Sequence, residues 1–271
     1  MKFSVWSCLF AAMALTACET VQTTQGGVVG VERRQSMSSL VSSSQMDRSA
    51  AQAYRQVIAE AGKKNQLNRD PAQVERVRGI ASRLIPSTAA FRADAPNWNW
   101  EVNVISSDEV NAWCMPGGKI AVYTGLLTRL NPTDDELAAV MGHEIAHALR
   151  EHGRERASEQ MAQQIGVSVL STALGLGDLG AQLTQTVLDV TFALPHSRTH
   201  ETEADRIGVE LAARSGYDPR AAVSLWQKMG KLGGSKPPEW MSTHPSDQTR
   251  TRDLQNYSER VLPLYEAARR R

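Results

Sequence analysis

The sequence predicts an α+β fold that is predominantly helical and carries one small β-sheet. Two observations predict it. Between residues 100 and 123, apolar and polar residues alternate over short segments, as they do in strands. Before that region, and after Asn131-Pro132 almost to the end of the chain, apolar residues recur at the three- and four-residue spacing of amphipathic helices.

Length and charge bound the class of protein. A chain of 271 residues can bury the core of one large domain or two small ones. Its 30 Lys and Arg residues are matched by 29 Asp and Glu residues. Because there is no excess of positive charge to attract a polyanion, a nucleic-acid partner is not expected.

The N-terminus predicts export. Residues 3–17 carry no charge and much apolar surface, which is typical of a secretory signal and too short for a permanent membrane span. They close on Leu-Thr-Ala-Cys at residues 15–18, which resembles a bacterial lipoprotein box. We expect residues 1–17 to be a signal peptide and Cys18 to carry lipid; the alternative is a plain signal peptide. Glu19 resembles the pattern of lipoproteins sent to the outer membrane, so the expected location is its periplasmic side, with a lipid anchor.

The segment after the signal is polar. Residues 18–48 are rich in Gln, Ser, Thr and Gly, which favours a lipidated flexible tether, although part of it could order against the domain that we expect over residues 49–271. Removal of Cys8 and lipidation of Cys18 leave only Cys114. One thiol cannot form an internal disulfide framework, and we expect Cys114 to be a small buried apolar residue.

The elements follow from local patterns. Helical spacing recurs over residues 53–61 and 74–85, and strands are expected at 100–105, 112–115 and 119–123, with a tight turn at Gly117-Gly118. Thr133 and Glu136 form a capping box that opens a helix running to about residue 151. Further helices are expected at 157–174, from about 178 to 194, after His200, and from Asp218-Pro219.

The helix that follows the capping box contains His143-Glu144-Ile145-Ala146-His147. Two histidines four residues apart project from one face of a helix and can share a metal ion. Glu144 lies one step round the helix, where a carboxylate can take a proton from a metal-bound water. The alternative is a pair of surface histidines on a helix.

A catalytic zinc needs a third protein ligand. Glu201 and Asp205 are four residues apart and share a helix face, which suits one ligand and one partner that holds a ligating histidine. Glu203 points away from both, and we expect it on a solvated face.

These residues carry a family resemblance. The motif at 143–147, followed by Ser197-Arg198-x-x-Glu201-x-Glu203-Ala204-Asp205, resembles the zinc peptidase family of HtpX and the CAAX prenyl proteases. Residues 111–118 and Thr243-His244-Pro245 with Arg250 add matching blocks in the same order. The resemblance implies a zincin-type, gluzincin-like metalloprotease with a sheet beside the active-site helix. The missing membrane helices place it nearer the soluble periplasmic lipoprotein branch.

The resemblance implies a role for each matching residue. His143, His147 and Glu201 match the ligands of one zinc ion per chain, and Glu144 matches the general base. Asp205 matches the acidic residue behind a ligating histidine. His244 matches a histidine that either stabilises the transition state, a role also open to Arg198, or silences the site as a fourth ligand. From the residues alone, a lone histidine before proline is more often structural or exposed. His196 is a polar group near the cleft or merely on the surface, and we expect His152 and His200 on the surface.

The resemblance also implies how substrate binds. Zinc peptidases of this kind hold the substrate backbone as an added strand, and residues 119–123 are the expected edge. The predicted function is a zinc metalloendopeptidase of the cell envelope that hydrolyses unfolded or misassembled proteins. The alternative is an assembly factor or chaperone with a restrained protease site. The membrane is expected as a partner through the lipid on Cys18; the sequence gives no sign of the oligomeric state.

Overall fold

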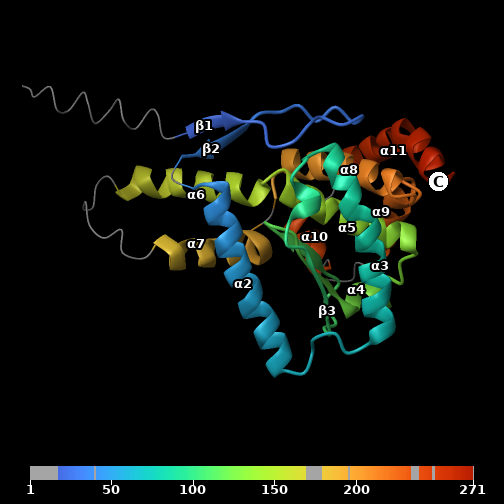
Figure 1. The fold of residues 1–271 in the computed structure, drawn as a ribbon, viewed down its shortest axis with the longest axis horizontal. Helices are drawn as coiled ribbons and strands as arrows, with labels where there is room; N and C mark the ends of the chain where they lie inside the picture. The colour runs from blue at the N-terminus through green and yellow to red at the C-terminus, as the bar shows by residue number, and fades with distance from the viewer. Residues whose placement is uncertain are drawn as a thin grey trace, which may run out of the picture.

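The computed structural model describes residues 18–39, 41–168, 179–194, 196–232, 238–245 and 248–270. The predicted signal peptide, residues 1–17, lies outside the described residues. Within them helices predominate and the strands form two small sheets, which confirms the predicted fold class (Figure 1). In the part of the chain that the structure describes, no helix has the length and apolar character needed to cross a membrane.

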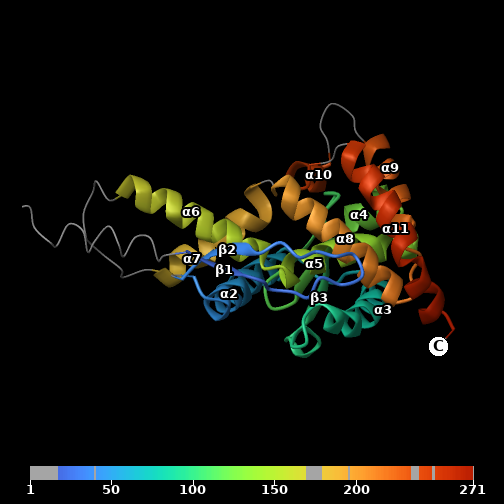
Figure 2. The same ribbon diagram turned by 90° about the horizontal axis from the view of Figure 1, so that it is seen from above.

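The helices pack around two that lie in the middle of the body. These two are α5 and α8, and Figures 1 and 2 show α6 and α7 projecting from the same side of that body. The α-helices are α2 (Ser43–Lys63), α3 (Pro71–Ser87), α4 (Thr124–Arg129), α5 (Asp134–Leu149), α6 (His152–Ser168), α7 (Leu179–Leu188), α8 (Arg198–Arg214), α9 (Ala221–Lys231), α10 (Glu239–Thr243) and α11 (Gln248–Ala268). Short turns of other helix types are η1 (Thr88–Ala90), η2 (Ala95–Asn97) and the π-helical η4 (Asp189–Ala193).

The larger sheet has three strands in the order β3-β5-β4. They are β3 (Glu101–Ile105), β4 (Ala112–Met115) and β5 (Lys119–Tyr123), and β5 pairs parallel with β3 and antiparallel with β4. The prediction that residues 119–123 form the edge is therefore wrong, because β5 is the central strand.

In the described part of the chain, β4 has no strand paired on its outer side. The outer side of β3 is covered, because the Asn68 amide donates to the Val104 carbonyl at 2.8 Å and Leu67 forms an antiparallel bridge with Ile105. Strand β4 packs beside α5 instead. An extended peptide that joins the sheet would pair with β4.

The turn between β4 and β5 requires glycine. Gly117 and Gly118 have φ of +74° and +79°, which favours glycine over other residues. A Cβ atom at Gly118 would also lie 2.6 Å from the ring of Trp100. The tight turn predicted at these residues is confirmed.

Helix α5 begins as predicted. The Thr133 hydroxyl accepts from the Glu136 amide at 3.3 Å, and the Glu136 carboxylate accepts from the Thr133 amide at 2.8 Å. This capping box satisfies two amides that would otherwise lack partners at the helix start. From Glu136 to Leu149 every residue of α5 is buried, so the helix forms the centre of the core.

Helices α5 and α8 approach each other closely at two glycines. A Cβ atom at Gly142 would lie 2.8 Å from the Gly208 carbonyl oxygen, and one at Gly208 would lie 2.8 Å from the backbone nitrogen of His143. The absence of side chains at this crossing brings α8 against the turn of α5 that carries His143.

Gly208→Ala is therefore expected to destabilise the fold. The added methyl group meets backbone atoms that cannot move aside, and overpacking of this kind costs about 1–3 kcal/mol. The measurement is urea unfolding. Gly79→Ala is the matched control, because Gly79 lies in α3 and a Cβ atom there meets nothing within 4 Å. Equal unfolding midpoints for the two variants would contradict the close approach.

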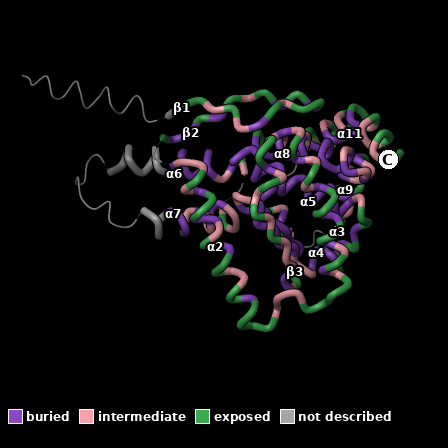
Figure 3. The backbone as a smooth tube through the Cα atoms, in the orientation of Figure 1, coloured by how far each residue is buried: buried purple, intermediate pink, exposed green. Residues whose placement is uncertain are grey.

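The N-terminal segment is ordered against the domain. Strand β1 (Cys18–Val21) pairs antiparallel with β2 (Gln35–Ser38), and Figures 1 and 2 show the segment running along α6 and α8. Between the strands, Val29 is buried in the core and its amide donates to the Glu210 carboxylate of α8 at 3.0 Å. Figure 3 shows buried residues along this segment beside exposed ones. The structure thus differs from the flexible tether expected for residues 18–48.

Candidate metal centre

Helix α5 holds two imidazoles on one face. His143 and His147 are one turn apart, their Nε2 atoms lie 3.1 Å from each other, and their rings meet at a centroid distance of 4.7 Å. Both residues are buried. The alternative of two surface histidines is therefore excluded.

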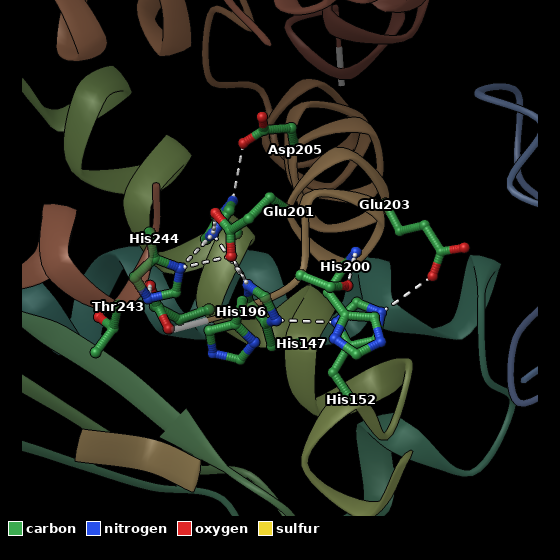
Figure 4. A network of polar contacts seen from close by, with 12 residues as sticks. His147, His152, His196, His200, Glu201, Glu203, Asp205, Thr243 and His244 are labelled. Carbon is green, nitrogen blue, oxygen red and sulfur yellow. Dashed lines mark hydrogen bonds and ion pairs between the residues drawn. The ribbon is translucent and has the colours of Figure 1, made fainter. Parts of the chain in front are cut away.

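Two further donors converge on the same point. From α8, Glu201 places one carboxylate oxygen 3.6 Å from His143 Nε2 and the other 3.4 Å from His147 Nε2. His244 follows α10, and its Nδ1 lies 3.2 Å from His143 Nε2 and 3.0 Å from Glu201 Oε1. Figure 4 shows His147, Glu201 and His244 directed toward one another.

The spacing of these donors fits zinc. Ligand atoms of His143, His147, Glu201 and His244 all lie within 4.8 Å of one another. Bonds of roughly 2.0–2.1 Å to nitrogen and oxygen in a tetrahedron place the ligand atoms roughly 3.3–3.4 Å apart. Five of the distances between donor atoms, counting both oxygens of Glu201, lie between 3.0 and 3.6 Å and bracket that value. The donor set, imidazoles and one carboxylate, is also the one that catalytic zinc prefers.

The charge states of His147 and Glu201 suit a divalent cation. Burial lowers the pKa of His147 well below its ordinary value, so the imidazole is neutral. Burial alone would raise the pKa of Glu201, but His244, His147 and His143 outweigh it and hold that pKa well below the usual range. Neutral imidazole and ionised carboxylate are the forms that bind metal.

Asp205 lies directly behind His143. Its Oδ1 is 2.9 Å from His143 Nδ1, which donates its proton there and leaves Nε2 directed at the other donors. Arg250 holds Asp205 with two bonds of 2.8 Å and also lies 2.6 Å from Glu201. Burial would raise the pKa of Asp205, but Arg250 and His143 outweigh it and lower that pKa.

Glu144 lies beside the donor cluster but is not part of it among the described residues. Its Oε1 accepts a hydrogen bond of 2.6 Å from the indole nitrogen of Trp240 and lies 3.5 Å from His244 Nε2. The carboxylate is therefore fixed in direction and free of the ligand set. Trp240 has no sequence signal of its own, because α10 is too short to show a helical pattern.

Three polar residues that we expected in solvent are buried. Glu203, His152 and His200 are 6%, 0% and 3% exposed, so the surface predictions are wrong. Glu203 accepts from Arg33 of the N-terminal segment, and His200 lies 3.0 Å from Glu155. The partners are distant in sequence, which is why spacing within one helix gave no sign of them.

His196 and Arg198 lie at the start of α8 in different surroundings. The His196 ring lies 4.0 Å from the His147 ring and is stacked at 4.9 Å on that of His244, so it belongs beside the cluster. Arg198 is exposed at the first residue of α8. Cys114 is buried, and burial raises the pKa of its thiol well above the ordinary value, as expected of an inert residue.

Comparison with known proteins defines the class. The family described as peptidase family M48 matches residues 71–258, more than half of the chain. The chain therefore belongs to peptidase family M48 and is a zinc-dependent metalloendopeptidase with a zincin-like fold, which confirms the predicted enzyme class and cofactor. The finer likeness to HtpX and the CAAX prenyl proteases stays a prediction.

Particular relatives fall into two groups. The chain is 40% identical over 169 residues to the mitochondrial metalloendopeptidase OMA1 of Arabidopsis thaliana, covering 62% of this chain and 34% of that protein. It is 34% identical over 221 residues to the mitochondrial metalloendopeptidase OMA1 of Bos taurus, covering 76% and 41%. It is 28% identical over 208 residues to the β-barrel assembly-enhancing protease of Escherichia coli, covering 73% and 41%. The chain thus spans well under half the length of these relatives.

The relatives correct the predicted location. The periplasmic side of an outer membrane was expected from the N-terminal residues, but several of the most similar proteins are mitochondrial. The prediction of a lipid-anchored periplasmic protein is therefore wrong. Of the N-terminal pattern that led to it, residues 1–17 lie outside the described structure, whereas Cys18 and Glu19 lie in β1.

Proposed function

We propose that His143, His147 and Glu201 hold the zinc ion of an endopeptidase that cleaves unfolded or misassembled proteins. The observation that carries the proposal is the four-donor cluster with the separate carboxylate of Glu144 beside it. Bound zinc would polarise the scissile carbonyl and acidify the attacking water.

Side chains of this protein would transfer the proton of the attacking water and stabilise the negative charge that develops on the carbonyl oxygen. Glu144, held by Trp240, takes a proton from the attacking water and returns it to the leaving amine. The carboxylate is already aligned because the indole bond fixes one of its oxygens. His244 Nε2, 3.5 Å from Glu144, faces the same space and can donate to the developing oxyanion.

The proposed substrate class follows from the sheet. Among the described residues no strand pairs with the outer side of β4, which lies beside α5, so an extended backbone would bind there through main-chain bonds that do not depend on sequence. Folded proteins offer few such segments. The name of the β-barrel assembly-enhancing protease, a relative, supports a role on proteins during assembly.

A paired substrate tests this proposal. The full chain is given one protein in two forms, native with its disulfides and reduced and carboxymethylated. We expect cleavage of the unfolded form alone, lost with a chelator and restored by zinc. Equal cleavage of the two forms would contradict the substrate class, and cleavage that survives chelation would contradict the zinc mechanism.

A second candidate function is an assembly factor whose protease site is restrained. The observation that favours it is the position of His244 Nδ1, which occupies the fourth corner of the cluster at 3.2 Å from His143 Nε2 and 3.0 Å from Glu201. A catalytic zinc needs that corner for water.

His244→Ala separates the two roles of His244. If His244 restrains the site, the variant is expected to keep zinc and cleave an unfolded protein faster than wild type. If His244 instead stabilises the transition state, cleavage falls about 10²–10³-fold. The proposed mechanism, in which His244 Nε2 donates to the oxyanion, predicts the fall, and an increase would favour the restrained assembly factor. The measurement is the initial rate of casein cleavage at equal zinc content.

A further inference from the structure

A second buried layer of polar side chains lies behind His147. His147 Nδ1 is 2.9 Å from His152 Nδ1, and His152 Nε2 is 3.0 Å from Glu203 Oε2. Figure 4 shows this row of three side chains leading away from the donor cluster. We propose that Glu203, acting through His152, is a positioning residue that sets the tautomer and orientation of His147. The inference rests on the proposed role of His147 as a ligand.

The interruption between helices α5 and α6 brings His152 to this position. On an uninterrupted α-helix a residue five positions after His147 would lie about 140° away around the axis. Helix α5 ends at Leu149, and Glu151 adopts a φ of +51° before α6 begins at His152. This left-handed residue turns the chain so that the His152 ring meets the His147 ring at a centroid distance of 4.9 Å.

The carboxylate decides which nitrogen of each ring carries the proton. Glu203 can only accept, so His152 Nε2 must hold the hydrogen that it donates. In neutral His152 the Nδ1 atom is then an acceptor, and the bond between the two Nδ1 atoms requires a proton on His147. His147 Nε2 is left with its lone pair directed at His143 and Glu201, as a ligand needs.

Glu203 is itself held by two cations. Arg33 donates to it from Nε at 2.7 Å and from Nη2 at 3.1 Å, and Arg150 donates from Nε at 3.0 Å. Arg33 belongs to the N-terminal segment, so that segment completes the row behind His147. Asp205 supports His143 directly, whereas Glu203 supports His147 through one intervening ring.

Glu155 provides a matched comparison for Glu203. It is bound by the same Arg33, at 2.7 and 2.8 Å, and it is also buried next to a histidine, His200 at 3.0 Å. The row behind His147, however, runs through His152 and Glu203. Loss of either carboxylate charge should disturb Arg33 similarly, while only loss at Glu203 should reach the proposed ligand.

The test is the zinc dissociation constant of the full chain, measured by competition with a chromophoric chelator. Changes behind a ligating histidine cost about 10–100-fold in metal affinity. We expect Glu203→Gln and His152→Phe each to weaken zinc binding by at least about tenfold, because an amide no longer dictates the tautomer and a phenyl ring makes no bond. Glu155→Gln should leave the zinc dissociation constant near the wild-type value, because Glu155 bonds to Arg33 and His200 and the row behind His147 runs through Glu203. The visible spectrum of the cobalt-substituted protein should shift in Glu203→Gln and not in Glu155→Gln.

Two results would overturn the proposal. One is wild-type zinc affinity in Glu203→Gln and His152→Phe; the other is equal weakening in Glu155→Gln, which would assign the effect to packing around Arg33. If one variant does not fold, the other still decides. His147→Ala in the same assay separates this proposal from the function: lost zinc there with unchanged Glu203→Gln overturns the positioning role alone, and retained zinc overturns the ligand assignment as well.

Discussion

Glu144→Gln is expected to abolish proteolysis while the protein keeps its zinc and its fold. The amide has the shape of the carboxylate, and its oxygen can still accept the 2.6 Å bond from Trp240. It cannot accept a proton from water. General-base catalysis contributes about 10²–10⁴-fold, so cleavage of casein should fall by at least about 10²-fold. The measurements are the initial rate of cleavage and the zinc content of the same sample.

Glu60→Gln is the control for Glu144→Gln. Glu60 lies on α2 in an exposed ion pair with Lys64, and such pairs contribute little to stability. Its activity should match wild type. Casein cleavage retained by Glu144→Gln at wild-type rate would remove Glu144 from the mechanism, and loss of zinc in that variant would make it a ligand instead.

Glu201→Ala has the second large expected effect, the loss of zinc. Glu201 is 0% exposed and is the carboxylate donor of the cluster. Mutation of a residue that only hydrogen-bonds to a ligand already lowers metal affinity by about 10–100-fold. Removal of a ligand itself should therefore lower zinc affinity by at least about 100-fold. The measurement is zinc per chain after dialysis, with the thermal unfolding temperature taken alongside.

His244 affects how the Glu201→Ala result is interpreted, because it lies in the same cluster and can serve as the third ligand beside His143 and His147. The experiment is therefore repeated with His244→Ala in both backgrounds. Glu201→Gln serves as the control for folding, since it keeps the shape beside Arg250. Unchanged zinc stoichiometry in the Glu201→Ala, His244→Ala double variant would point to another ligand.

The parts of the site that lie within single helices could be predicted from the sequence. The capping box of Thr133 and Glu136 fixes where α5 begins, and the four-residue spacing of His143 and His147 then fixes their shared face. The same argument placed Glu201 and Asp205 on one shared face of α8. These features depend on the geometry of a single helix, so the spacing of residues in the sequence is enough to predict them.

The parts that join distant segments could not be predicted. The pattern of residues 119–123 predicts a strand. It does not predict that β3 pairs with this strand on the side opposite β4. Glu203 does point away from Glu201, by about 200° around the helix, as two-residue spacing requires. On that side of α8, Glu203 meets Arg33, which is 170 residues earlier in the chain, and no local sequence pattern predicts this contact.

One titration tests the central claim, that this cluster holds the zinc of an endopeptidase. Zinc is added back to the metal-free full chain while casein cleavage is followed. We expect no cleavage without metal, a rise that saturates at one zinc per chain, and at least about a 10²-fold lower rate at every zinc concentration in Glu144→Gln. Cleavage by the metal-free chain, or by zinc-loaded Glu144→Gln at the wild-type rate, would contradict it.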